Sequence, residues 1–328
     1  MTSSASYTMK PLLGWLVVLG VVLSLVAGLA FAQGSRGSFA DRRGRLVAAE
    51  LSPSGGDRLS VFQELTLRSS TGLEVHALLR RPRGSRAPHA AIVLVGGLKQ
   101  GRRVGTIPGL EPIARHAVIA ALDYPLRFPR RAWEGGQLVS TLLHLRPAAL
   151  DTIAHTLLLL DYLESRDDVD GRRLFLVGGS LGAVVVTIAG GVDPRPAAIV
   201  ALYGGGQLGS LITHTLEHRA QDVPYSHWAA ILAGHGLSWL FMPLAPERYA
   251  PAIAPHPFLM VNGTDDSLVP RDNVFALYRA ARPPKDLIWV ESEHVQPEEG
   301  ELIGHLSGTV TAWLTERGLL PNDRAAPR

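Results

Sequence analysis

The chain has 328 residues, of which 46% are hydrophobic and 19% are charged, with a net charge of +3 and no cysteine. A chain of this length and hydrophobicity can bury a large core. Without the apolar N-terminal segment described next, roughly 290 residues remain, which one α/β domain can contain. The lack of cysteine excludes disulfides, thiolate metal ligands, a cysteine nucleophile and a lipoprotein attachment site.

The N-terminus carries an apolar segment that is separate from the rest of the chain. Residues 12–32 are almost continuously apolar, and residues 30–32 have the small-x-small pattern of a signal-peptidase site. About 20 apolar residues also suffice to span a bilayer. We predict that residues 1–33 are a signal peptide or a membrane anchor and that residues 34–59 are a linker. The cleavage pattern favours export or an anchored domain outside the cytoplasm, whereas the arginines after the segment favour a cytoplasm-facing anchor.

The first elements of the body are strands. Apolar and polar residues alternate over 62–68 and 74–81, which predicts an antiparallel hairpin at one edge of a sheet. Apolar runs at 90–95 and 117–122 predict buried strands. Apolar residues at helical spacing then predict an amphipathic helix over 148–164.

The segment around Ser180 is the most informative part of the chain. The apolar run 174–177 predicts a buried strand and 183–189 predicts a helix, and the residues between them include the pattern Gly-x-Ser-x-Gly at 178–182. Glycines allow a strand and a helix to approach closely around a serine with a strained backbone. The hydroxyl would then lie beside the free N–H groups of a helix N-terminus. We predict that Ser180 is a nucleophile; a glycine-rich turn with an incidental serine is the alternative.

The second half continues the alternation of strands and helices. Strands are predicted at 198–203, 258–261 and 287–290, with helices over 271–281 and from about 297 to 318. Strands separated by helices predict an α/β fold with a doubly wound, mostly parallel sheet of about eight strands. Ligands of such sheets bind outside the carboxyl ends of the strands.

An acid and a histidine follow Ser180 in the chain order that a serine hydrolase of this architecture requires. Asp265 and Asp266 come just after the strand at 258–261, and His294 comes after the strand at 287–290. We predict His294 as the general base and Asp266 as the acid that orients it, with Asp265 as the alternative. A turn carboxylate that binds its own backbone is the other interpretation of either aspartate.

These motifs resemble those of the α/β-hydrolase fold. With 178–182 as nucleophile elbow, 263–270 as acid loop and His294 as base, residues 60 to 318 are similar to bacterial serine esterases, acyl hydrolases and dienelactone-hydrolase-like proteins. The resemblance implies one α/β-hydrolase domain over 60–320, followed by a tail at 321–328. It favours a carboxylic ester as the substrate, with a thioester, a lactone and a small amide as alternatives.

The oxyanion hole is where the chain departs from the family pattern. No His-Gly dipeptide follows the strand at 90–95. We predict the backbone N–H of Leu181 as one donor and that of Gly97 or Leu98 as the second.

The predicted function is hydrolysis of an ester-like acyl substrate through an acyl-enzyme. A free serine hydroxyl is a weak nucleophile, so His294 would take the proton of Ser180 while Asp266 stabilises the charged imidazole. An acyltransferase that uses the same triad and a non-catalytic binding protein of the same fold are the alternatives.

Residues 204–256 do not continue the alternation. We predict a helical cap over the active site that supplies an apolar acyl or alcohol pocket, with additional core packing as the alternative. His214 and His218 are spaced to share a helix face as metal ligands, but no third-ligand motif accompanies them. We therefore predict no metal and no cofactor.

The expected binding partner is a small-molecule acyl substrate. The basic cluster at 127–131 is not continued by a stripe of basic and aromatic residues, so a solvated loop is favoured over a nucleic-acid site. Membrane anchoring through residues 1–33 is the one other association that the sequence indicates, and it indicates no protein partner.

Overall fold

The computed structural model describes residues 39–84, 87–97, 100–125, 135–219 and 241–322. The predicted signal peptide or anchor (1–33) and the basic cluster at 127–131 lie outside these residues, so both interpretations stay predictions. Within the described part, no helix combines the length and the apolar character that a membrane crossing requires.

The described strands form a single nine-stranded sheet in the order β1-β2-β3-β5-β4-β6-β7-β8-β9. The pairs β1–β2, β2–β3 and β3–β5 are antiparallel and all other pairs are parallel. The strands are β1 (Leu46–Gly56), β2 (Ser60–Ser69), β3 (Glu74–Pro82), β4 (His89–Val95), β5 (Ala117–Leu122), β6 (Val169–Gly179), β7 (Ala198–Leu202), β8 (Phe258–Gly263) and β9 (Lys285–Val290).

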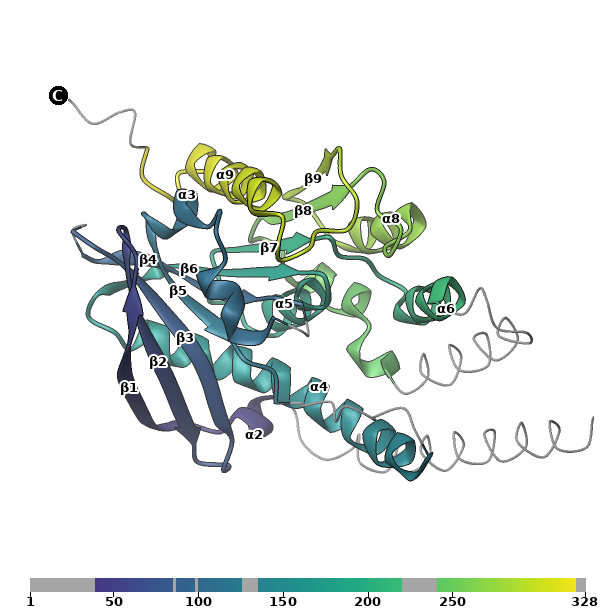
Figure 1. Ribbon diagram of the computed structural model, residues 1–328, viewed down its shortest axis with the longest axis horizontal. Coiled ribbons are helices and arrows are strands. Elements are labelled where there is room, and N and C mark those ends of the chain that lie inside the picture. Colours follow the sequence, from purple (N-terminus) through teal and green to yellow (C-terminus); the bar gives the residue numbers. More distant parts are fainter. Residues whose placement is uncertain (1–38, 85–86, 98–99, 126–134, 220–240, 323–328) are drawn as a thin grey trace, which may run out of the picture.

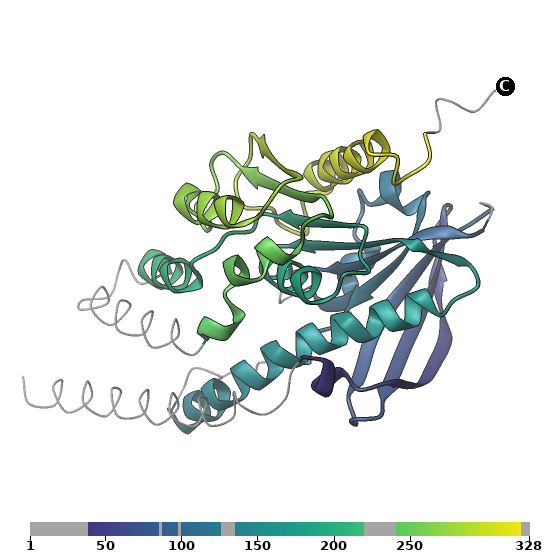
Figure 2. The same cartoon turned by 180° about the vertical axis from the view of Figure 1, so that it is seen from behind.

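Helices cover both faces of this sheet (Figure 1). The face that carries α4, α5 and α8 packs one buried hydrophobic cluster, and the face that carries α3 and α9 packs another. Seen from behind, α4 runs along the sheet on the side away from α9 (Figure 2). The helices are α2 (Phe39–Arg43), α3 (Glu111–Ala114), α4 (Gly135–Glu164), α5 (Leu181–Val192), α6 (Leu208–Arg219), α8 (Arg271–Ala280) and α9 (Gly300–Glu316). Short 3-10 helices are η1 (Gly101–Thr106), η2 (Met242–Leu244), η3 (Pro246–Arg248) and η4 (Ala250–Ala252).

The predicted doubly wound, mostly parallel sheet is confirmed, with one strand more than expected. The additional strand is β1, which lies in the segment 34–59 that was predicted as a linker. Most side chains of β1 are exposed and its last residues are Ser-Pro-Ser-Gly-Gly, so it lacks the alternation by which strands are recognised. Because β1 forms the edge, the β2–β3 hairpin lies one strand further in than predicted.

The structure differs from the sequence-based prediction at the helix predicted over 148–164, and it describes only part of the insertion 204–256. The helix predicted over 148–164 begins at Gly135, and Pro147 lies inside it. The prediction began later because the apolar residues at helical spacing begin at Leu150. The insertion 204–256 contains α6 and the short helices η2, η3 and η4. Its residues 220–240 lie outside the described part, and its role as a cap stays a prediction.

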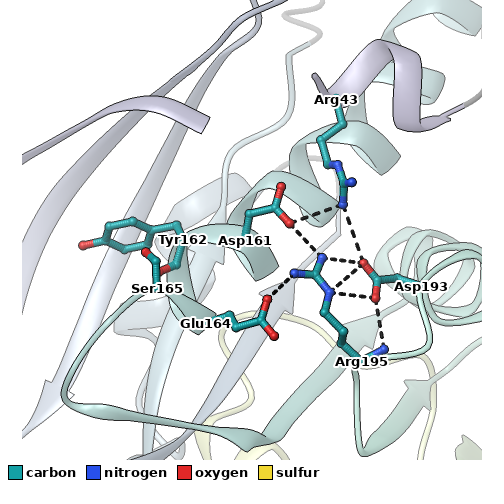
Figure 3. Close-up of polar contacts among 7 residues, drawn as sticks. All are labelled: Arg43, Asp161, Tyr162, Glu164, Ser165, Asp193 and Arg195. Atoms are coloured by element: carbon teal, nitrogen blue, oxygen red, sulfur yellow. Dashed lines mark hydrogen bonds and ion pairs between the residues drawn. The ribbon is translucent and has the colours of Figure 1, made fainter. Parts of the chain in front are cut away.

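A cluster of charged side chains joins α2, α4 and the α5–β7 connection (Figure 3). Arg195 contacts Asp193 at 2.5 Å, Glu164 at 2.6 Å and Asp161 at 2.8 Å. Arg43 reaches Asp161 at 3.3 Å from the other side. Burial opposes ionisation of Asp193, but hydrogen bonds from Arg195 hold the pKa of this carboxyl below its ordinary value. The cluster precedes β7, so it lies at the amino ends of the parallel strands, away from Ser180.

Candidate active site

Ser180 lies at the turn between β6 and α5, and its backbone is strained. Its φ of 55° is rare for a residue with a side chain. The Ser180 N–H donates to the carbonyl of Leu202 at 2.9 Å, which ties the turn to β7. At Gly182, a Cβ atom would lie 1.9 Å from the carbonyl oxygen of Val95. Only glycine therefore allows α5 to approach β4 this closely.

The structure brings Ser180, His294 and Asp266 together. Nε2 of His294 lies 2.9 Å from Oγ of Ser180, and Nδ1 lies 2.8 Å from Oδ2 of Asp266. The side chain of His294 is 8% exposed and that of Asp266 is 2% exposed, so bulk water does not screen this pair. With the ring proton on Nδ1, the imidazole donates to Asp266 and accepts from the serine hydroxyl.

Backbone N–H groups fix the orientation of Asp266. Its Oδ1 accepts from the N–H groups of Leu268 at 2.8 Å and Val269 at 2.9 Å, which leaves Oδ2 facing His294. The neighbouring Asp265 is exposed, and its carboxylate accepts the hydroxyl of the preceding threonine at 3.0 Å. Of the two candidate acids, only Asp266 contacts the histidine.

Tyr203 is a further residue of the site that the sequence did not indicate. Its ring meets the His294 ring edge-on, with 5.5 Å between centroids, and its hydroxyl lies 2.5 Å from Oγ of Ser292. The backbone of Tyr203 is left-handed, with a φ of 52°. Burial raises the pKa of its hydroxyl, so the side chain stays neutral beside the imidazole. An aromatic residue just after a buried strand, ahead of Gly204, was the available signal.

The predicted oxyanion donors can be placed in part. Leu181 is the first residue of α5, where N–H groups have no partner inside the helix. Leu181 and Gly97 both line the cavity that contains Ser180. Leu98, the alternative to Gly97, lies outside the described residues.

Two side chains support the loop after β4. The Tyr124 hydroxyl donates to the carbonyl of Gly96 at 2.6 Å. The side-chain oxygen of Gln100 would lie 2.5 Å from a Cβ atom at Gly97, so a larger residue at position 97 would displace the Gln100 side chain. Neither residue was predicted, because their role depends on the path of the loop.

A cavity of about 1000 Å³ opens at Ser180 and His294. Besides His294, the cavity is lined by the charged residues Arg102, Arg103 and Asp123, and Arg102 pairs with Glu64 at 3.2 Å. Among the described residues, none that lines the cavity comes from the insertion 204–256. The predicted pocket beneath a cap stays a prediction, because residues 220–240 of the insertion lie outside the described part.

Within the described residues, no three or more histidine, aspartate or glutamate side chains form a group that could hold a metal ion. Nε2 of His214 lies 2.9 Å from the backbone carbonyl of Ser267, a contact that links α6 to the loop of Asp266. The side chain of His218, its possible co-ligand by spacing, lies outside the described part of the chain.

Comparison with known proteins gives weak matches in sequence. No protein-family model matches the chain. The uncharacterized protein YfhR of Salmonella typhi is 26% identical over 151 residues, which are 43% of this chain and 47% of that protein. The match thus spans about half the length of the curated relative.

Similarity in structure is much broader. Acetyl xylan esterase 1 from Thermoanaerobacterium sp. superimposes with a TM-score of 0.56 at 16% identity, over 83% of this chain and 92% of that one. Methylesterase BT1017 has a TM-score of 0.57 at 20% identity, over 95% of this chain and 69% of that one. The Pyrococcus furiosus esterase PF2001 has a TM-score of 0.55 at 17% identity, over 78% of this chain and 90% of that one. Together with the strand order and the strand–serine–helix turn, these matches show that the chain has the α/β-hydrolase fold.

Proposed function

We propose that the chain is a serine hydrolase that cleaves carboxylic ester-like substrates through an acyl-enzyme intermediate. The observation that carries the proposal is the position of His294, whose two ring nitrogens face Ser180 and Asp266 at hydrogen-bond distance. This arrangement supplies a nucleophile, a base and the group that orients the base. The three proteins of similar fold named above are esterases, which supports the ester as substrate class.

In the first half-reaction, Oγ of Ser180 attacks the ester carbonyl while its proton moves to Nε2 of His294. Asp266 stabilises the resulting imidazolium. When the tetrahedral intermediate collapses, the ester C–O bond breaks and His294 returns the proton to the departing alcohol. The acid part of the substrate remains bound to Ser180 as an ester.

In the second half-reaction, His294 takes a proton from water, and the hydroxide attacks the acyl-enzyme. Collapse releases the carboxylic acid, and the proton returns to the Ser180 oxygen. In both steps the proposed donors to the oxyanion are the backbone N–H of Leu181 and that of Gly97 or Leu98. One such donor contributes about 3 kcal/mol of transition-state stabilisation.

The test compares Ser180→Ala with the wild type and with Ser52→Ala, which removes an exposed hydroxyl on β1. We expect Ser180→Ala to lower kcat for p-nitrophenyl esters about 10⁴-fold or more, because the nucleophile is lost. A fluorophosphonate probe should label the wild type and Ser52→Ala, but not Ser180→Ala. Thermal unfolding of the three proteins checks that folding is unaffected.

Other outcomes would point to the alternatives. Wild-type turnover in Ser180→Ala would remove the serine from the mechanism. Transfer of the acyl group to an added alcohol in preference to water would identify an acyltransferase. A protein that neither reacts with the probe nor turns over any ester would be a non-catalytic binding protein.

A further inference from the structure

The peptide group between Gly96 and Gly97 lies just after β4, at the cavity that contains Ser180. Its carbonyl oxygen accepts the hydroxyl of Tyr124 at 2.6 Å, and Tyr124 comes just after the neighbouring strand β5. All three of these residues line the cavity. Burial raises the pKa of the Tyr124 hydroxyl, so this group keeps its proton and acts as the donor.

A hydrogen bond to this carbonyl also fixes the N–H on the other side of the same peptide plane. The 96–97 peptide bond is trans, since the cis bonds of the described residues all precede proline. In a planar trans peptide the C=O and the N–H point in opposite directions. The Gly97 N–H therefore points away from Tyr124, and it donates to no backbone carbonyl of the described residues.

The two residues that flank this peptide plane leave it free to rotate. Both are glycine, which lacks the Cβ contacts that restrict the backbone angles of other residues. Rotation by half a turn would exchange the two groups, so that a carbonyl oxygen would point where the Gly97 N–H now points. A carbonyl oxygen repels a developing negative charge, whereas an N–H group stabilises it. The orientation of this plane therefore decides whether it favours or opposes an oxyanion.

The same carbonyl lies beside the first turn of α5. A Cβ atom built on Gly182 would lie 2.9 Å from the Gly96 carbonyl oxygen. Leu181, whose N–H is the other proposed oxyanion donor, immediately precedes Gly182. The peptide plane that Tyr124 holds is thus next to the helix N-terminus that begins at Leu181.

We infer that Tyr124 is a positioning residue, whose hydroxyl orients the 96–97 peptide so that the Gly97 N–H is the second donor to the oxyanion. The inference rests on the proposed hydrolase function, and it selects Gly97 over Leu98. Tyr124 acts through the Gly97 N–H, so its hydroxyl affects the tetrahedral intermediate and not the binding of the ester. Such a residue changes kcat and leaves KM nearly unchanged.

The experiment compares the wild type with Tyr124→Phe, which keeps the ring and removes the hydroxyl. The matched control is Tyr249→Phe, because that hydroxyl also donates to a backbone carbonyl, of Pro243 at 2.7 Å, and Tyr249 does not line the cavity. The substrates are a p-nitrophenyl ester and its thiono analogue, in which sulfur replaces the carbonyl oxygen. Thermal unfolding checks that each variant is folded.

We expect Tyr124→Phe to lower kcat for the oxygen ester about tenfold, since one neutral hydrogen bond shifts the balance between two orientations by up to about that factor. The KM should stay close to that of the wild type. Sulfur is a weak hydrogen-bond acceptor, so kcat for the thiono ester should fall much less. Tyr249→Phe should keep the wild-type kcat for both esters.

A second replacement keeps the hydroxyl and changes its acidity. A fluorinated tyrosine in place of Tyr124 has a more acidic phenol, and an ionised phenol cannot donate to the Gly96 carbonyl. The alkaline limb of the kcat profile should therefore move to lower pH, whereas the same replacement of Tyr249 should leave the profile in place. This variant retains the hydroxyl and the ring, so it tests the inference even if Tyr124→Phe does not fold.

The outcomes separate this inference from the hydrolase proposal. A wild type that neither reacts with a fluorophosphonate probe nor turns over any ester would overturn both. An active wild type whose kcat is unchanged in Tyr124→Phe would overturn the inference alone. Equal losses of kcat for the two esters would also overturn it, because the hydroxyl would then act on the placement of Ser180 or His294. The same holds for an alkaline limb that does not move when Tyr124 is fluorinated.

Discussion

The Asp266 carboxylate is held at both of its oxygens. One accepts two backbone N–H groups of its own loop, and the other faces Nδ1 of His294 at 2.8 Å. A carboxylate fixed in this way selects the imidazole tautomer that carries its proton on Nδ1. The other nitrogen is then free to accept the proton of Ser180. An amide in place of the carboxylate can donate to Nδ1 and thereby stabilises the wrong tautomer.

Asp266→Asn should therefore lower kcat about 10⁴-fold while the fold is retained. Asp265→Asn makes the same chemical change one residue away, on an exposed side chain that does not contact His294. It should leave kcat close to that of the wild type. Steady-state kinetics on one p-nitrophenyl ester compares both variants, and similar losses in the two would contradict the assignment of Asp266.

The sequence could not decide between these two aspartates. Both follow the buried strand β8, and both have the residue type that the acid requires. The choice depends on how the loop folds back onto the backbone N–H groups of Leu268 and Val269. Such a local path is not encoded in hydrophobic periodicity. The contact of Tyr203 with His294 was missed for the same reason.

The junction of β6, α5 and β4 is the element-scale feature that places the serine. Gly178 and Gly182 face each other across it: a Cβ atom at Gly178 would lie 2.2 Å from the Gly182 carbonyl oxygen. A methyl group at either position requires the helix to move away from the sheet. The position of Ser180 relative to β4 would change with it.

We expect Gly182→Ala to lower the free energy of unfolding by more than about 2 kcal/mol, because overpacking against a backbone carbonyl cannot be relieved by a side-chain rotation. Gly308→Ala is the control in α9, where a Cβ atom would meet nothing within 4 Å. It should raise the free energy of unfolding by up to about 1 kcal/mol through helix propensity. Urea denaturation measures both, and equal changes would contradict the packing argument.

The sequence predicted the strands that consist of apolar runs. It did not predict the exposed strand β1 or the short helices η1 and α3. The runs at 90–95 and 117–122 correspond to β4 and β5. β1 was missed because its side chains are exposed, so burial left no pattern in its composition. The short helices η1 and α3 have too few residues for a helical period to be visible in the sequence.

At the scale of the whole molecule, we expect the protonation of His155 to make the free energy of unfolding depend on pH. It lies on α4, 3% exposed, and its Nδ1 has no hydrogen-bond partner among the described residues. Burial, with a smaller contribution from the nearby His76, lowers the pKa of His155 to about 4. In the folded protein this side chain therefore stays neutral over a pH range in which the same side chain binds a proton in the unfolded chain.

The sign of the pH dependence follows from that lowered pKa. Above the unfolded pKa of about 6.5, both states are neutral and the stability is fully present. Between about pH 6.5 and pH 4 only the unfolded state gains a proton, so the free energy of unfolding falls, by about 3 kcal/mol in total. His155→Leu should remove this loss. His305→Leu, at an exposed histidine of α9, should keep it. Urea midpoints measured from pH 4 to pH 7 compare the proteins, and identical slopes would contradict the role of His155.

Strand β1, which was not predicted from the sequence, forms one edge of the sheet. Within the described residues β1 has a strand on one side only, and such an open edge is a template for fibre growth. Its pairing register shifts near Leu46 and again between Pro53 and Gly55, and Pro53 has no N–H to offer. Glu50, paired with Arg68 at 2.9 Å, places charge in the middle of the strand. We expect these features to disfavour extension of the ladder by a second molecule.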